Sequence, residues 1–196
     1  MKVYIDGQEF TDFLGDGRAV SILDAVKRST TNDGLVVTEI RLDDVVMDEE
    51  AFSRVSGGLA AHFTTRSVRG LVLESLEEAL KYIPRLSKGF EEIALHFEKN
   101  EFAAGEGKLA DGADGLDWLL RVFQNCSSLL TVGDADSDGL REQKDSLADS
   151  ISSLAAFHSE KNYPRMAYFI RQNLAPEIEK FSMYVQKLRD LASSTQ

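Results

Sequence analysis

Residues 35–47 carry the sequence LVVTEIRLDDVVM, which is the clearest strand signal in the first third of the chain. Residues 35–42 are rich in β-branched side chains, and their second half alternates between apolar and polar, which is typical of a half-buried strand. The Asp-Asp pair at 43–44 favours a tight turn. Residues 45–47 are therefore predicted to return as the second strand of a hairpin.

A second hairpin and a helix are predicted on the N-terminal side of this stretch. Residues 3–5 form a short apolar strand, the Asp-Gly pair at 6–7 is typical of a type I′ turn, and residues 8–10 return. Apolar residues then recur at helical spacing over 20–27, and the Asn-Asp-Gly sequence at 32–34 is a helix stop.

On the C-terminal side, Asp48 is predicted to cap a short helix that ends before the glycine pair at 57–58, and residues 61–65 form a last strand. The order strand, strand, helix, strand, strand, short helix, strand resembles the β-grasp, or ubiquitin-like, arrangement. The resemblance implies a small α+β domain over residues 1–67 and implies no function. Because the glycine pair lies inside this domain, a conjugated modifier is excluded.

From residue 68 onward the strand signals stop and apolar residues recur with a helical period. Helical patterns cover residues 76–97, 102–123, 140–157 and 163–192. Pro84 is expected to kink the first pattern or divide it in two, two glycines interrupt the second, and Pro176 is expected to bend the last. Residues 68–196 are therefore predicted to form an antiparallel helical bundle, which makes the whole chain an α+β protein.

The bundle carries a hint of internal repetition. Glu-Lys-Asn near an aromatic residue occurs at 98–102 and again at 160–163, each time between two predicted helices. With a shift of 62 residues, Leu116 falls on Ile178. Duplicated helical hairpins and chance similarity both explain this pattern.

The charge of the chain excludes several classes of partner. Its 196 residues include 22 lysines and arginines and 33 acidic residues, so the formal net charge is −11. Nucleic acid and anionic membranes are not expected partners, because both require clustered cations. The apolar fraction of 43% excludes disorder of the whole chain. With no signal peptide or spanning segment and with Cys126 as the one cysteine, a cytoplasmic location is expected.

Residues 134–145 follow the spacing of an EF-hand calcium loop, with glycine where the loop turns sharply. The candidate metal ligands are Asp134, Asp136, Asp138, Glu142 and Asp145. Two residues depart from the pattern: Arg141 replaces an apolar residue, and Asp145 replaces a bidentate glutamate. The alternative is an acidic connector over 133–139 in which Asp138 caps the next helix. Weak Ca²⁺ binding is the one cofactor interaction that the sequence suggests.

No catalytic motif is found, so a catalytic activity is not predicted. The histidines His62, His96 and His158 lack metal-ligand spacing, and the last two lie near predicted helix C-termini. Neither a nucleophile elbow nor a phosphate-binding loop is present.

Aromatic and methionine side chains offer a candidate partner-binding patch. Some of them lie off the main apolar stripe of the last helix, so this helix is apolar over more than one face. The candidate residues are Trp118, Tyr163, Tyr168, Phe169, Met183 and Tyr184. The alternative is that they pack in the core of the bundle.

Three functions are compatible with the sequence. The first is a non-catalytic adaptor whose helical half binds a protein or peptide partner. The second is an export chaperone, because the helical half is similar in size, charge and helix content to the small acidic chaperones of flagellar and type III secretion. The third is an enzyme or ligand-binding protein with a site between the two halves. Self-association into a homo-oligomer is compatible with all three.

Overall fold

The computed structural model describes residues 1–13, 17–130 and 134–194. The chain divides into two compact units, which we call the sheet unit (Met1–Leu71) and the helical unit (Val72–Gln196). None of the described helices combines the length and the apolar character that crossing a membrane requires.

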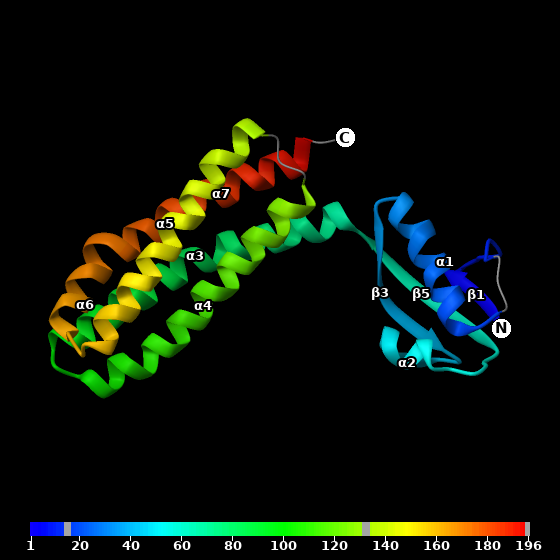
Figure 1. Ribbon diagram of the computed structural model, residues 1–196, viewed down its shortest axis with the longest axis horizontal. Coiled ribbons are helices and arrows are strands. Elements are labelled where there is room, and N and C mark those ends of the chain that lie inside the picture. The colour runs from blue at the N-terminus through cyan, green and yellow to red at the C-terminus, as the bar shows by residue number, and fades with distance from the viewer. Residues whose placement is uncertain (14–16, 131–133, 195–196) are drawn as a thin grey trace. The chain divides into compact units, whose positions relative to one another are not determined.

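The sheet unit contains a five-stranded sheet with the order β2-β1-β5-β3-β4. The strands are β1 (Lys2–Ile5), β2 (Gln8–Glu9), β3 (Leu35–Leu42), β4 (Val45–Met47) and β5 (Ala60–Ser67). β1 runs parallel to β5, and the other neighbouring strands are antiparallel. Together with α1 (Ala19–Asn32) and α2 (Glu49–Ser53), the sheet forms the β-grasp arrangement that the order of elements predicted (Figure 1).

Both hairpin turns of this sheet use two consecutive residues with positive φ. The angles are 49° at Asp6 and 81° at Gly7 in the first turn, and 47° at Asp43 and 69° at Asp44 in the second. Two positive φ angles define a type I′ turn, whose twist matches that of the flanking strands. Aspartate tolerates this conformation better than most residues, so the turn chemistry explains why both hairpins form.

The first aspartate of each turn also binds β5. The Asp6 carboxylate accepts a hydrogen bond from the Thr65 N–H at 2.8 Å. The Asp43 carboxylate accepts bonds of 2.9 Å from the N–H groups of Leu59 and Ala60. Because these N–H groups bind the ionised form, they hold the pKa of Asp43 below its ordinary value. The two turns are thereby attached to the strand that lies between their hairpins.

The core of the sheet unit lies between one face of the sheet and the two helices. Phe52 of α2 contacts Phe63 of β5 edge-on, with ring centroids 5.3 Å apart, and both side chains are fully buried. Apolar side chains of β1, β3, β5 and α1 complete the core: Val3, Ala19, Ile22, Leu23, Val26, Ile40, Leu42 and Ala61.

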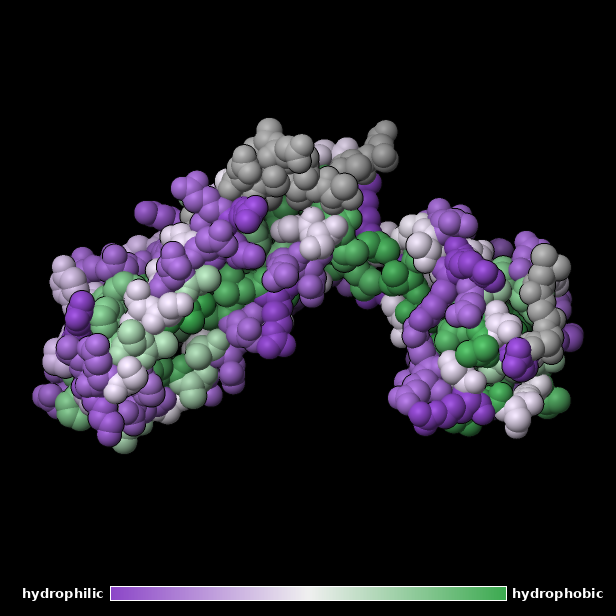
Figure 2. Space-filling view, in the orientation of Figure 1, coloured by the Kyte–Doolittle hydropathy of each residue, from purple (hydrophilic) through white to green (hydrophobic). Residues whose placement is uncertain are grey.

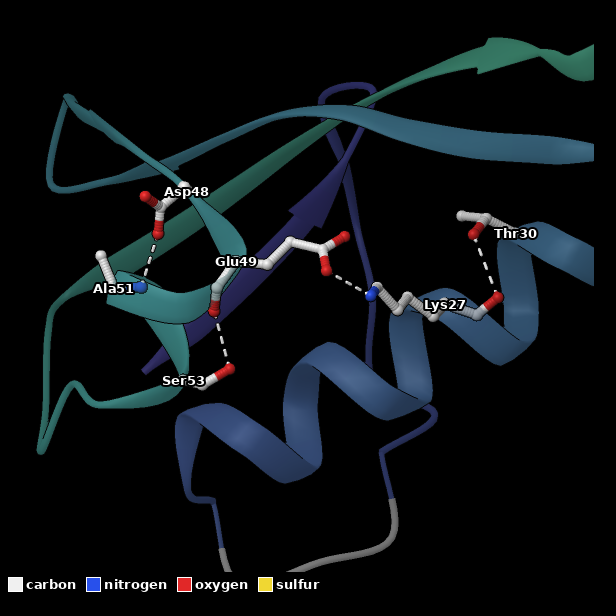
Figure 3. Close-up of polar contacts among 6 residues, drawn as sticks. All are labelled: Lys27, Thr30, Asp48, Glu49, Ala51 and Ser53. Carbon is white, nitrogen blue, oxygen red and sulfur yellow. Dashed lines mark hydrogen bonds and ion pairs between the residues drawn. The ribbon is translucent and has the colours of Figure 1, made fainter. Parts of the chain in front are cut away.

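Helix α2 begins where the sequence predicted. The Asp48 side chain accepts a hydrogen bond of 2.7 Å from the Ala51 N–H, which satisfies one of the free donors at the start of the helix. The next residue, Glu49, forms an ion pair of 2.5 Å with Lys27 of α1 (Figure 3). The cap and the ion pair therefore position α2 against α1 at the edge of the core.

The helical unit consists of two antiparallel helical hairpins (Figure 1). The first hairpin is α3 (Val68–Glu98) and α4 (Phe102–Leu129). The second is α5 (Asp134–Ser159) and a long segment formed by α6 (Tyr163–Phe169), the π-helical η1 (Ile170–Leu174) and α7 (Ala175–Ser194). The antiparallel helical bundle predicted from the sequence is therefore confirmed.

The first helical pattern is not divided at Pro84, whereas the kink at Pro84 and the bend at Pro176 stay predictions. Pro84 lies inside α3, which is a single helix rather than two. The proline removes one backbone hydrogen bond, but Ile83 and Leu86 beside it are buried, and this packing stabilises the helix. Near Pro176 the helix contains the π-helical segment η1, in which the Ala175 N–H donates to the Ile170 carbonyl.

The glycines that interrupt the second helical pattern do not end α4. A Cβ atom added to Gly105 would overlap the ring of Phe97, and one added to Gly115 would overlap the Tyr82 hydroxyl. Gly112 likewise faces Phe90, with 3.0 Å between an added Cβ and the ring. All three aromatic residues belong to α3. The glycines therefore allow α4 to approach α3 closely at three levels.

The first hairpin turns at Asn100, which has a φ of 60°. The Asn100 N–H donates to the Phe97 carbonyl, and the Glu101 N–H donates to the His96 carbonyl. This pair of bonds is a Schellman motif, which satisfies carbonyls at the end of α3.

The second hairpin turns by the same motif. Lys161 has a φ of 52°, its N–H donates to the His158 carbonyl, and the Asn162 N–H donates to the Phe157 carbonyl. Residue 161 is equivalent to residue 100, so the two corners are related by a shift of 61. The Glu-Lys-Asn similarity, which has a shift of 62, therefore lies one residue out of structural register.

The residue offset between equivalent positions of the two hairpins changes within the C-terminal segment. A shift of 61 places Leu109 on Ile170, and a shift of 62 places Leu116 on Ile178, and all four side chains are buried. The change occurs across η1, because a π-helical turn contains one more residue than an α-helical turn. The two hairpins thus share their corner and these buried positions apart from one additional residue, and a duplication as their origin stays a prediction.

The acidic connector predicted over 133–139 is helical from Asp134 onward, because α5 begins there. Acidic residues are stabilising in the first turn of a helix, so the residues that suggested a loop also suit a helix N-terminus.

Candidate functional site

A groove of about 260 Å³ lies between α4 and α5. Its lining side chains come from both helices: Glu106, Leu109, Ala110, Ala113, Leu116, Ile151, Leu154, Ala155 and His158. Seven of these nine are apolar. Figure 2 shows an apolar strip on this face of the helical unit, between the more polar outer surfaces of α4 and α5.

Alanines widen this groove. Ala110 and Ala113 of α4 and Ala155 of α5 are exposed, whereas Leu116 and Leu154 beside them are buried. A methyl group fills little of the space between two helices, so the larger leucines form the floor and the alanines leave the walls open. The groove therefore offers apolar contact to a side chain that enters from outside.

A polar cluster marks one end of the groove. The Tyr163 hydroxyl donates a hydrogen bond of 2.6 Å to Glu106 Oε1, and His158 Nε2 lies 3.9 Å from the same oxygen. This hydrogen bond raises the pKa of Tyr163, with smaller contributions from burial and from the negative charge of Glu106. Within the described residues no hydrogen bond reaches Glu106 Oε2, so this oxygen can accept one from a cation.

Aromatic stacking fixes Tyr163 in this cluster. Its ring stacks on Phe102 with centroids 4.4 Å apart, and it contacts Phe97 at 5.2 Å. Phe102 and Tyr163 are the first residues of α4 and α6, so the stack joins the corners of the two hairpins. The position of Glu106 is thus supported by both hairpins.

The six predicted partner-binding residues do not form one patch along the groove. None of them belongs to the described lining, and Tyr163 is hydrogen-bonded to one lining residue, Glu106. Trp118 is 40% exposed on α4 and contacts Tyr82 edge-on, with centroids 5.1 Å apart. The remaining four belong to the C-terminal segment.

Within that segment, two of the four side chains are exposed. Tyr168 is 67% exposed and Met183 is 62% exposed. Phe169 is half-buried and contacts Phe157 at 5.4 Å, and Tyr184 is also half-buried. The C-terminal segment is therefore apolar on exposed as well as buried positions.

The side chains of Asp134, Asp136 and Asp138 lie outside the described residues, so the predicted calcium site stays a prediction. The backbone over residues 134–145 is helical, and a helix directs its carbonyl groups into its own hydrogen bonds, whereas an EF-hand loop uses one as a ligand. Among the described residues, no group of three or more histidine, cysteine or acidic side chains is arranged to hold a metal ion.

Two of the histidines and the cysteine that the sequence analysis considered for chemistry pack or bond within the fold. His96 Nδ1 lies 2.6 Å from Glu101 Oε2 at the corner after α3, and His62 stacks on Tyr4 in the sheet unit. Cys126 is buried in α4, and burial raises its pKa to about 11, so its thiol stays protonated at neutral pH.

The groove was not predicted from the sequence, because an alanine in a helix does not by itself distinguish a packed position from the wall of a groove. One feature of the sequence could have indicated the groove: Ala110, Ala113 and Leu116 lie three residues apart and therefore on one side of α4. The opposite wall, around Ile151 and Leu154, was included in a predicted helix but not in a predicted site.

A family described as a domain of unknown function (DUF8042) has a model that matches residues 74–183, which is more than half of the chain. All residues that line the groove lie within the matched region. Comparison with curated proteins and comparison with solved structures gave no match.

Proposed function

Since the chain belongs to the DUF8042 family, whose description gives no activity, we propose from its groove that it is a non-catalytic protein-binding module. The helical unit would hold an amphipathic helix of a partner protein between α4 and α5. The observation that carries the proposal is the apolar lining of this groove.

The lining favours a helical occupant. Apolar surface that leaves water on binding contributes roughly 25 cal/mol per Å². An amphipathic helix presents apolar side chains every three or four residues along one face, which suits an apolar groove between two helices. Ala110, Ala113 and Ala155 provide the space for those side chains.

Charge favours a basic partner. Residues 72–196 contain 14 lysines and arginines and 21 acidic residues, a net charge of −7. Glu106 places one carboxylate in the groove lining itself, where a lysine or arginine of the partner can donate a hydrogen bond to Oε2. Complementary charge of this kind increases the association rate and selects the partner.

The surroundings of the titratable groups support binding rather than catalysis. In the described part of the chain, Cys126 is the one titratable side chain that is buried. Glu106 and His158 are 43% and 49% exposed, so water solvates both. Catalytic acids and bases are commonly tuned by burial, which these two lack.

The test is affinity capture from the native cell lysate with three forms of the full chain. The wild type is compared with Ala113→Arg, which places a long cation in the groove, and with Ala103→Arg, which makes the same change at an exposed α4 position outside the lining. We expect a stoichiometric protein on the wild type and on Ala103→Arg, and its loss from Ala113→Arg.

Two outcomes would overturn the proposal: the same protein retained by Ala113→Arg, or no stoichiometric protein on any form. Circular dichroism of each variant checks that the helices are intact. The export-chaperone hypothesis uses the same groove, and a captured protein that is itself secreted would favour it over an adaptor.

A further inference from the structure

Strand pairing places one row of side chains across the whole sheet. The pairs are Glu9 with Tyr4, Tyr4 with His62, His62 with Arg41, and Arg41 with Val46. Residues directly opposite one another in a sheet point to the same face. The row therefore runs over all five strands, from β2 to β4.

This row lies on the face of the sheet that α1 and α2 do not cover. Successive residues of a strand point to opposite faces, and the neighbours Val3, Ala61 and Phe63 point into the core. Lys2 and Arg66 lie two and four residues from Tyr4 and His62, so they share the face of the row. We call the side chains of Lys2, Tyr4, Glu9, Arg41, His62 and Arg66 the outer face.

Cations outnumber carboxylates among the strand residues of the outer face, although the sheet unit as a whole is acidic. The sheet unit, residues 1–71, contains eight lysines and arginines and twelve acidic residues, a net charge of −4. Three of the eight cations lie on the outer face, whereas Glu9 and Glu39 are the acidic residues of β1 to β5 that the pairing places there. The strands thus place three cations and two carboxylates on this face, a net charge of +1, and Asp44 of the adjoining turn also acts electrostatically on Arg41.

The centre of the outer face is flat and aromatic. The Tyr4 and His62 rings stack with centroids 4.7 Å apart and planes 9° apart. Arg41 lies beside His62 and forms an ion pair of 2.6 Å with Glu39, with half of its side chain still exposed. Tyrosine and arginine are the residue types that protein interfaces concentrate near their centres.

We infer that the outer face binds an acidic segment of a partner protein. Its cations would pair with carboxylates of that segment, and the Tyr4–His62 stack would give it a flat apolar contact. A protein segment is favoured over nucleic acid because the chain as a whole has a net charge of −11, which repels a polyanion that extends beyond the face. The chain would then have two binding sites, one in the groove for a basic partner and one on the outer face for an acidic partner.

The experiment measures fluorescence anisotropy of a labelled oligoglutamate peptide, short enough to stay within the outer face, with the full chain at low salt. Arg41→Glu and Lys2→Glu reverse a charge on the outer face, and Arg28→Glu makes the same change on an exposed position of α1. We expect saturable binding by the wild type, about tenfold weaker binding by each outer-face variant, and a change within about twofold for Arg28→Glu.

Three results would overturn the inference. Equal weakening by Arg28→Glu would show that only the total charge matters. A labelled oligothymidylate of similar length that binds more tightly than oligoglutamate, and loses affinity in Arg41→Glu, would make the face a nucleic-acid site. No saturable binding of oligoglutamate would show that the face does not bind anions. None of these results bears on the groove, because the groove lies in the other unit.

Discussion

The sheet unit and the helical unit are stabilised by different kinds of interaction. In the sheet unit, neighbouring residues in the sequence decide much of the structure: Asp6 and Gly7 form one turn, and Asp43 and Asp44 form another. In the helical unit, residues far apart must fit one another, as when Gly105 of α4 accepts the ring of Phe97. A hairpin turn can be predicted from a short stretch of sequence, whereas the packing of a glycine against a ring in another helix cannot.

The largest expected loss of stability tests whether the two units unfold independently. Phe63→Ala removes a fully buried ring from the core of the sheet unit, which we expect to cost about 3–5 kcal/mol. The sheet unit should then unfold while the helical unit, whose core is separate, keeps its structure. Thermal unfolding followed by circular dichroism and by NMR of the β5 amides measures both. Simultaneous loss of the helices would show that the two units fold as one.

The second effect tests the fit between α3 and α4. Gly105→Ala adds a Cβ that overlaps the Phe97 ring, and we expect a loss of about 1–3 kcal/mol in urea unfolding. Gly107→Ala is the matched control, because it lies in the same helix and meets no atom. Alanine should stabilise the helix there by up to about 1 kcal/mol. A gain at both positions would contradict close packing at Gly105.

A smaller effect tests the turns of the sheet unit through pH. The hydrogen bonds from Leu59 and Ala60 lower the pKa of Asp43 in the folded state, so Asp43 stabilises the fold above its unfolded pKa. This contribution is lost as the pH falls through the lower, folded value. Asp43→Ala should therefore be less stable than the wild type at neutral pH, and the difference should decrease below about pH 4. A difference that does not vary with pH would exclude the carboxylate as its cause.

The smallest effect concerns calcium and the start of α5. If the helix extends from Asp134 in solution, millimolar Ca²⁺ should give no saturable heat in calorimetry. Saturable heat that disappears when Asp134 and Asp136 are both changed to alanine would instead support the EF-hand prediction, and would require this segment to leave the helical conformation.

The sequence predicted the strands and the caps better than it predicted the helical contacts. β3 and β4 begin and end where the apolar alternation and the Asp-Asp pair indicated, and Asp48 caps α2 as expected. These features depend on residues only a few positions apart, so their physical causes are all present in one stretch of sequence.

The helical contacts were harder to predict because each depends on a partner in another helix. In the sequence, Gly112 and Gly115 indicate interruptions, because a glycine weakens an isolated helix. Their benefit arises only when α3 packs against them. The groove was hard to predict for the same reason. Ala110 and Ala113 carry no functional signal until α5 is placed opposite them. Tyr163 was predicted among the partner-binding residues, but its contact with Glu106 could not be derived from sequence spacing.

The extra residue in η1 also explains how the second hairpin tolerates a difference in length. One codon gained within an α-helix rotates every later side chain by about 100° around the axis, which would turn the buried face of α7 toward water. In η1 the added residue instead widens one turn, so Ile178 and Phe181 keep their places in the core. An alignment of the two hairpins therefore needs a gap at residues 170–174. Deleting Gln172 should return this segment to the regular helix of its counterpart α4.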